Sequence, residues 1–148
     1  MLPQPKTVIA IVPISATNGA TATGEPIDTV GYDYAMISVV ASTANVASNT
    51  LSVLKIEEGD TTSSYATFTG AVQSTDYTVN TSAYTTFGAG SNQNVWTFLV
   101  DCRARKRYLR VSASPQTTMV IGGVAMLTRG EQAPVTAAKA GALNLISV

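Results

Sequence analysis

Histidine is absent from the chain, and cysteine occurs only once among its 148 residues, as Cys102. Without histidine, the sequence lacks the most common general base, the Ser-His and Cys-His nucleophile pairs, and most zinc sites. A single cysteine excludes a disulfide within the chain, and its place at the end of an apolar segment predicts a buried, unreactive thiol. We therefore predict that the protein is not an enzyme and has no catalytic residue, cofactor or metal site.

Charge is also scarce, because only 12% of the residues are charged, roughly half of the share that soluble domains usually carry. The basic and acidic residues number 9 each, so no overall basic excess is present to hold nucleic acid. Low charge weakens the repulsion between copies, which a permanently assembled subunit tolerates better than a free enzyme. The composition therefore favours a building block of an assembly.

Long hydrophobic runs are missing as well. The apolar segment at residues 7–14 is interrupted by Pro13, lacks a basic start and a small-residue cleavage site, and is too short to cross a bilayer. We therefore expect a chain that is made in a cytoplasm, stays soluble and has no membrane partner.

Helical periodicity is almost absent too. The patterned segments are rich in Val, Ile, Thr and aromatic residues, with turn residues between them, which is typical of strands. Such short strands at this spacing predict an all-β fold, a single antiparallel β-sandwich with jelly-roll-like topology and extended N- and C-terminal arms. The predicted strands cover residues 7–14, 27–30, 34–41, 51–57, 64–69, 95–102, 107–113 and 118–127.

The domain organisation follows from the same pattern. Residues 1–6 form the predicted N-terminal arm, residues 7–130 the β-sandwich domain, and residues 131–148 the extended C-terminal arm. Residues 34–41 are apolar on both faces, which predicts a central strand, and residues 95–127 are expected to form a three-stranded meander. The predicted core consists of Ile9, Ile11, Met36, Val39, Leu54, Trp96, Phe98, Val100, Leu109, Val111, Ile121 and Leu127.

The C-terminal arm ends in apolar residues, and such a terminus needs a surface to cover. Leu143, Leu145 and Ile146 are its predicted anchors on a neighbouring subunit. Ordering an arm costs on the order of 1–2 kcal/mol per residue, so backbone pairing with the neighbour has to assist the apolar contacts.

Five of the 9 basic residues fall within eight positions, and we call them the basic cluster: Arg103, Arg105, Lys106, Arg107 and Arg110. Two interpretations stand. The cluster is either an electrostatic contact for an acidic partner surface or a phosphate, or a hairpin turn with solvated charges in which Asp101 pairs locally. Its concentration in a charge-poor chain favours the contact.

Glu57, Glu58 and Asp60 form an acidic group at the end of one predicted strand. Their spacing lacks the alternating oxygen ligands of a calcium loop, so a plain strand-end turn is the favoured interpretation. Glu57 and Glu58 are also candidate contacts for the basic cluster of a neighbouring copy.

Four segments carry a pattern that is shared with a known family: residues 34–40 (YAMISVV), 53–58 (VLKIEE), 101–111 (DCRARKRYLRV) and 125–129 (AMLTR). Together they span residues 30–130 and resemble the head decoration (cement) proteins of tailed bacteriophages, a group of small all-β capsid-associated proteins. No catalytic motif belongs to this group.

The resemblance implies a virion structural protein that decorates or cements the outer surface of a phage capsid by crosslinking capsomers. It implies synthesis in the host bacterial cytoplasm, a final place on the outer capsid surface, and the major capsid protein as partner. We expect a homo-oligomer, with a trimer favoured over a dimer because local threefold junctions are where capsomers can be joined. No nucleic-acid or membrane partner is expected.

The alternative function is a carbohydrate-binding or host-adhesion module of a phage head or tail fibre. Surface-facing Tyr65, Tyr77 and Tyr84 are its candidate residues, whereas Trp96 is expected in the core. Loss of shell stability on removal of the protein favours a cement role, and loss of adsorption favours adhesion.

Overall fold

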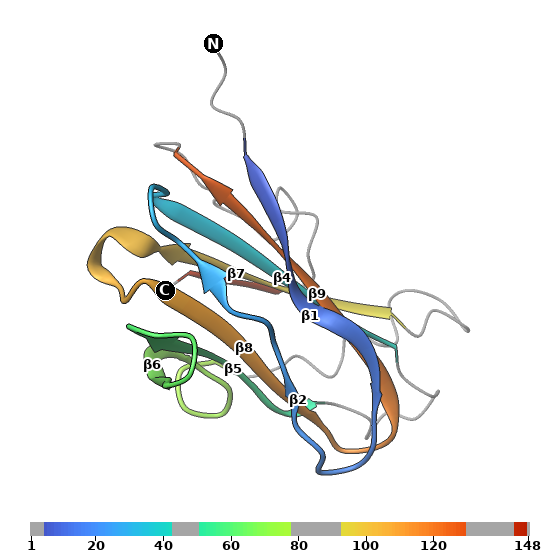
Figure 1. Cartoon of the computed structure of the whole chain (residues 1–148). Coiled ribbons are helices and arrows are strands. Elements are labelled where there is room, and N and C mark those ends of the chain that lie inside the picture. The colour runs from blue at the N-terminus through green and yellow to red at the C-terminus, as the bar shows by residue number, and fades with distance from the viewer. Residues whose placement is uncertain (1–4, 43–50, 78–92, 130–143, 148) are drawn as a thin grey trace.

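Two β-sheets pack face to face in the structure, a computed structural model that describes residues 5–42, 51–77, 93–129 and 144–147 (Figure 1). Sheet A contains, in spatial order, β1 (Lys6–Ala16), β9 (Met119–Thr128), β4 (Tyr34–Ser42), β7 (Gln93–Asp101) and β10 (Asn144–Ser147). Sheet B contains β2 (Ala22–Thr23), β8 (Tyr108–Pro115), β5 (Leu51–Gly59) and β6 (Ala66–Val72), and β3 (Ile27–Asp28) also pairs with β8.

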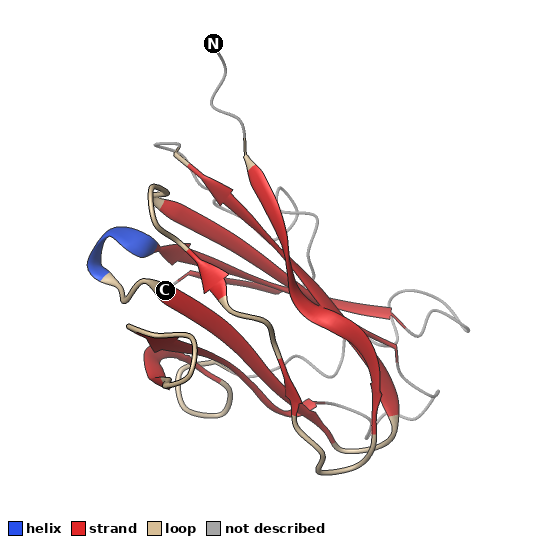
Figure 2. Cartoon of the chain, viewed as in Figure 1, coloured by secondary structure: helices blue, strands red, loops and turns tan. Residues whose placement is uncertain are grey.

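Strands dominate the described part of the chain, and its only helical element is the single 3₁₀ turn η2 (Cys102–Ala104) (Figure 2). Every pairing between strands is antiparallel except that of β10 with β7. The predicted all-β sandwich is therefore confirmed, while its jelly-roll-like topology stays a prediction.

The hydrophobic core lies between the two sheets and is filled by their inward-facing side chains. In β7, the alternate residues Trp96, Phe98 and Val100 are buried, as the period of two along a strand requires. Phe68 of β6 is also completely buried, and the ring of Tyr77 packs edge-on against Phe98 with centroids 5.7 Å apart. These aromatic rings supply much of the apolar area that the sandwich removes from water.

The central position predicted for residues 34–41 is correct, because β4 pairs with β9 on one side and β7 on the other. Two residues of the predicted core are not fully buried: the prediction is wrong for Ile9 and only partly correct for Met36. Ile9 is 54% exposed and Met36 is half-buried, because both occupy the outward-facing positions of sheet A.

Residues 95–127 do not form the predicted meander. β7 belongs to sheet A, β8 to sheet B and β9 to sheet A again, so the chain changes sheets twice. The first change occurs at η2, where the side chain of Asp101 accepts a hydrogen bond from the backbone N–H of Arg103. The crossing lets the apolar stripes of β7 and β8 face each other across one core, which two neighbouring strands of one sheet cannot do.

The C-terminal residues 144–147 differ from the predicted arm, because they form an edge strand of the chain's own sheet. β10 runs parallel to β7, with Leu145 opposite Thr97 and Ile146 opposite Phe98. Pairing with β7 satisfies backbone groups that an arm over a neighbour would have to satisfy elsewhere. Residues 131–143 and 148 lie outside the described residues. At the other end, β1 begins at Lys6, within the predicted N-terminal arm.

Replacement of Phe98 by Ala should lower the free energy of unfolding by about 3–5 kcal/mol, because it removes a fully buried ring from the core. Ile9→Ala is the matched control, and it should cost less than about 1 kcal/mol because the Ile9 side chain is largely exposed. Urea unfolding followed by far-UV circular dichroism measures both changes. Equal losses in the two variants would contradict the outward orientation of Ile9.

Candidate functional site

Two surfaces of the sandwich are candidates for function: the basic cluster and the outer face of sheet A. Among the described residues, no group of three or more Cys, Asp and Glu side chains is placed to hold a metal ion. No described helix is long and apolar enough to cross a membrane.

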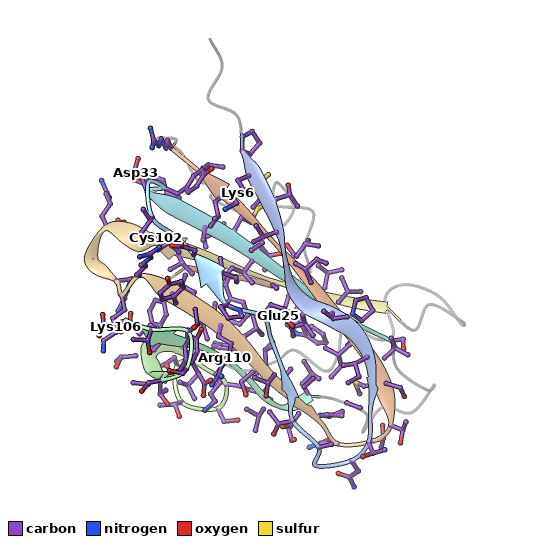
Figure 3. The ribbon with its side chains drawn as sticks, in the orientation of Figure 1. Lys6, Glu25, Asp33, Cys102, Lys106 and Arg110 are labelled. Carbon is purple, nitrogen blue, oxygen red and sulfur yellow. The ribbon has the colours of Figure 1, made fainter. Side chains whose placement is uncertain are left out.

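The basic cluster lies where the chain crosses from sheet A to sheet B and enters β8. Figure 3 shows Lys106 and Arg110 on the side of sheet B, away from Lys6 at the start of β1. The turn that precedes β4 is fastened to the same place, because the backbone N–H and the hydroxyl of Thr29 both donate to the carbonyl of Arg107, at 3.0 and 2.8 Å.

Every member of the cluster except Arg105 forms an ion pair within its own chain. The nitrogen–oxygen distances are 2.5 Å for Arg103–Asp101, 2.8 Å for Lys106–Asp60, 2.8 Å for Arg107–Asp28 and 2.6 Å for Arg110–Glu57. Glu58 accepts a hydrogen bond from the backbone N–H of Lys106 at 3.3 Å. The acidic group therefore complements the basic cluster inside one chain, whereas the sequence suggested a neighbouring copy.

Strand register explains this pairing. β5 and β8 are neighbours in sheet B, and Glu57 lies directly opposite Arg110. Cross-strand partners have Cβ atoms roughly 5 Å apart, so opposite charges in such positions meet without any rearrangement of the backbone. Two guanidinium nitrogens of Arg110 donate to Glu57 Oε2, Nε at 3.1 Å and Nη2 at 2.6 Å, and Lys55 Nζ lies 2.9 Å from Oε1.

Each arginine of the cluster also lies over an aromatic ring, an arrangement in which the cation is attracted to the ring face. The distances from the guanidinium carbon to the ring centroid are 5.1 Å for Arg103 over Tyr34, 3.9 Å for Arg105 over Phe68, 4.9 Å for Arg107 over Tyr108 and 4.0 Å for Arg110 over Tyr65. The cluster thus holds the crossing loop, residues 102–107 between β7 and β8, against both sheets. This arrangement agrees with the interpretation in which the charges pair within the chain. Contact with a partner remains a prediction.

These pairs shift the ionisation of their members. A hydrogen bond from Arg103 lowers the pKa of Asp101 to about 2. Burial acts to raise the pKa of Glu57, but hydrogen bonds from Lys55 and Arg110 outweigh it, so the pKa lies below its ordinary value. The charged form of both carboxylates is therefore held over a wide pH range.

Cys102 is buried as predicted, and burial raises the pKa of its thiol to about 12. Because only the thiolate is a good nucleophile, Cys102 is inert near neutral pH.

The candidate sugar-binding tyrosines that the structure describes already have partners within the chain. The Tyr77 hydroxyl donates to the carbonyl of Leu54 at 2.5 Å, and Arg110 covers Tyr65, while Tyr84 lies outside the described residues.

The outer face of sheet A is apolar across three neighbouring strands, β1, β9 and β4. We call it the apolar face, and it is formed by exposed Ile9, Val40, Val120 and Val124 together with half-buried Met36 and Met126. Register brings these positions side by side, because Val124 pairs with Ile9 on one flank and Ser38 on the other. At β7 the outward-facing residues Thr97 and Leu99 are buried, so the face ends at β4.

Charge is nearly absent from this face. Lys6, at the first position of β1, is the only charged residue in β1, β4 and β9, all three of which the structure describes in full. Three hydroxyl groups on or beside the face have partners within the chain, since Ser38 and Thr97 share a hydrogen bond of 3.0 Å and Ser42 Oγ accepts from the N–H of Val120. An exposed apolar surface of this kind is a candidate binding site.

The apolar face was missed at the level of sequence, although a signal for it exists. Both β4 and β9 are apolar at odd and even positions alike. Such strands are buried on both sides or expose one apolar side. The sequence pattern of residues 34–41 favours the first alternative, whereas the structure shows the second. Of the other predicted interface residues, Leu145 and Ile146 lie in β10, whereas Leu143 lies outside the described residues.

Comparison with known proteins adds no family to this description. Neither the family models that were scanned nor the curated proteins that were searched match this chain.

Replacement of Glu57 by Gln should lower the free energy of unfolding at pH 7 by about 1–2 kcal/mol, because it leaves the partly buried Lys55 and Arg110 without their carboxylate. Since the pKa of Glu57 is lowered on folding, its contribution is present above the ordinary value of 4.5 and is lost as the pH falls through the folded-state pKa. Denaturant unfolding between pH 7 and pH 3 measures this.

Asp60→Asn is the matched control, because the carboxylate of Asp60 and the ammonium of Lys106 are both well exposed. Exposed pairs contribute little, so this variant should follow the wild-type curve. A Glu57→Gln deficit that stays constant down to pH 3 would show that the ion pair is not its source.

Proposed function

We propose that the protein is a structural component of a phage virion that decorates and cements the outer surface of the capsid. The observation that carries the proposal is the apolar face, a broad uncharged surface on a stiff sandwich. A face of this kind stabilises an assembly by covering area and requires no chemistry. The sequence resemblance of residues 30–130 to phage head decoration proteins supports the same function.

A cement protein stabilises a shell by binding preferentially to its assembled form. Whatever binds the assembled shell, but not its separated or opened parts, stabilises the shell by its binding free energy. Many copies around one particle multiply that effect, because each bound copy bridges neighbouring capsomers. Rigidity matters in this role, and the core between the sheets, together with the fastened crossing loop, supplies it.

The basic cluster is the proposed contact with the major capsid protein. Although four of its members are ion-paired, the side chains of Arg103, Lys106 and Arg107 keep 59%, 44% and 51% of their surface exposed. Carboxylates on the shell can therefore reach these side chains without displacing their present partners. Exposed charges of this kind steer association and are screened by salt.

A carbohydrate-binding or host-adhesion module is the weaker alternative. Such sites present aromatic rings to the sugar, but Tyr65 and Tyr77 are occupied by Arg110 and by the core. No other observation on the described residues favours it.

Particles that lack the protein test the proposal. They should lose their genome at a lower temperature than complete particles, because the shell has lost the stabilising binding free energy of the protein. They should adsorb to host cells normally. Addition of the purified protein should restore heat resistance. A fluorescent dye that reports released DNA during a temperature ramp measures the first effect. Heat-resistant shells with lost adsorption would instead establish the adhesion alternative.

A double variant, Arg103→Glu with Arg107→Glu, tests the capsid contact. It should bind depleted particles at least tenfold more weakly at low salt, with a smaller difference at high salt. Arg129→Gln is a control that removes one positive charge outside the basic cluster, and it should bind as the wild type does. Cosedimentation with the particles measures binding, and equal binding of all three proteins would contradict the contact.

A further inference from the structure

We infer that the apolar face is the surface through which two copies of this chain associate, packed face to face across a two-fold axis. The inference rests on the proposed function and deepens it, because it assigns a partner to the face that carries the proposal. Its occupant is a second copy of the chain, and four features of the described residues lead to this choice.

The first feature is exposure. Ile9 and Val124 are 54% and 50% exposed, although they lie opposite each other in the middle of the pairing between β1 and β9. Val40 and Val120 extend the same surface along β4 and β9. Aliphatic side chains at neighbouring positions on three strands form a continuous patch, which differs from the scattered apolar residues of an ordinary surface.

The second feature is charge. The rest of the described surface carries the ion pairs of sheet B and the crossing loop, whereas the residues of the apolar face are uncharged. The single charge in β1, β4 and β9, Lys6, lies opposite the inward-facing Leu127 and therefore belongs to the other side of sheet A. A charged partner would lose hydration on this face and find no counter-charge there. A second apolar face meets it without that penalty and without repulsion between like charges.

The third feature is symmetry. In a two-fold dimer the same patch on both copies forms the interface, so one uncharged face meets another. In a cyclic trimer with head-to-tail contacts, the patch would meet a different surface of the next copy. The charge distribution therefore favours a dimer, in contrast to the trimer that capsid geometry suggested from the sequence.

The fourth feature is size. Three strands that are about 4.8 Å apart, over about ten residues of about 3.3 Å each, give the face a projected area on the order of 500 Å². A stable interface of standard size buries about 800 Å² on each partner. The apolar face thus matches the size of the apolar centre of such an interface.

The free edge of β1 does not offer a competing route. Pro13 removes one backbone donor from this edge strand, register shifts interrupt β1 between Ile9 and Ile14, and the carbonyl of Ala10 already accepts from the N–H of Glu25. Bulges and proline protect an edge from strand addition. Strand addition at β1 is therefore disfavoured, whereas association of two copies through side chains on the face needs no free edge.

Val124→Lys tests the inference, because it places a charge at the centre of the apolar face. Sedimentation velocity of the purified full chain, without particles, should show a dimer at micromolar concentration. The variant should dissociate at least tenfold more readily. Val120→Lys, on the same face, should behave alike, which guards against a folding defect in one variant. Val30→Lys is the control, since Val30 is 60% exposed in a turn, and it should remain dimeric.

A monomer or a trimer of the unaltered chain would overturn the inference, as would a dimer that both face variants, folded by circular dichroism, retain. The proposed function fails separately. A dimer that leaves the heat resistance of depleted particles unchanged would refute cementing and keep the interface. A monomer that restores heat resistance would refute the interface and keep cementing.

Discussion

The packing of sheet A against sheet B is the constraint on which the rest of the structure depends. Trp96, Phe98 and Phe68 occupy the space between the sheets, and their burial commits one face of every strand to a single core. The opposite faces then become surface by necessity. In sheet B and the crossing loop that surface is charged, whereas in sheet A it is aliphatic, so the fold divides the exterior into two chemically different parts.

The charged part is stabilised internally. Cross-strand register sets Glu57 against Arg110, and β3 supplies Asp28 to Arg107. The arginines lie over aromatic rings as well, which limits their motion and ties the crossing loop to both sheets. A group of five basic residues that looks like a site for anions in the sequence is therefore largely neutralised in the folded chain.

The edges of sheet A and its outer face differ in their capacity to bind another protein. One edge is formed by β10, a strand of only 4 residues, and the other is bent by bulges and interrupted by Pro13. Edges of this kind discourage open-ended addition of strands, which would lead to aggregation. The face between them stays apolar, and the proposed contacts through its side chains would give a closed assembly of defined size.

The sequence by itself determined the class of fold and much of the core. The period of two along residues 95–100 identified Trp96, Phe98 and Val100 as buried, because alternation along a strand is a local property. It could not show which sheet each strand joins, so the exchange of β7, β8 and β9 between sheets was missed. For the same reason it could not separate the outward Ile9 from the inward Ile11, nor tell that Glu57 meets Arg110 of its own chain. Those outcomes depend on long-range pairing, which only the tertiary structure decides.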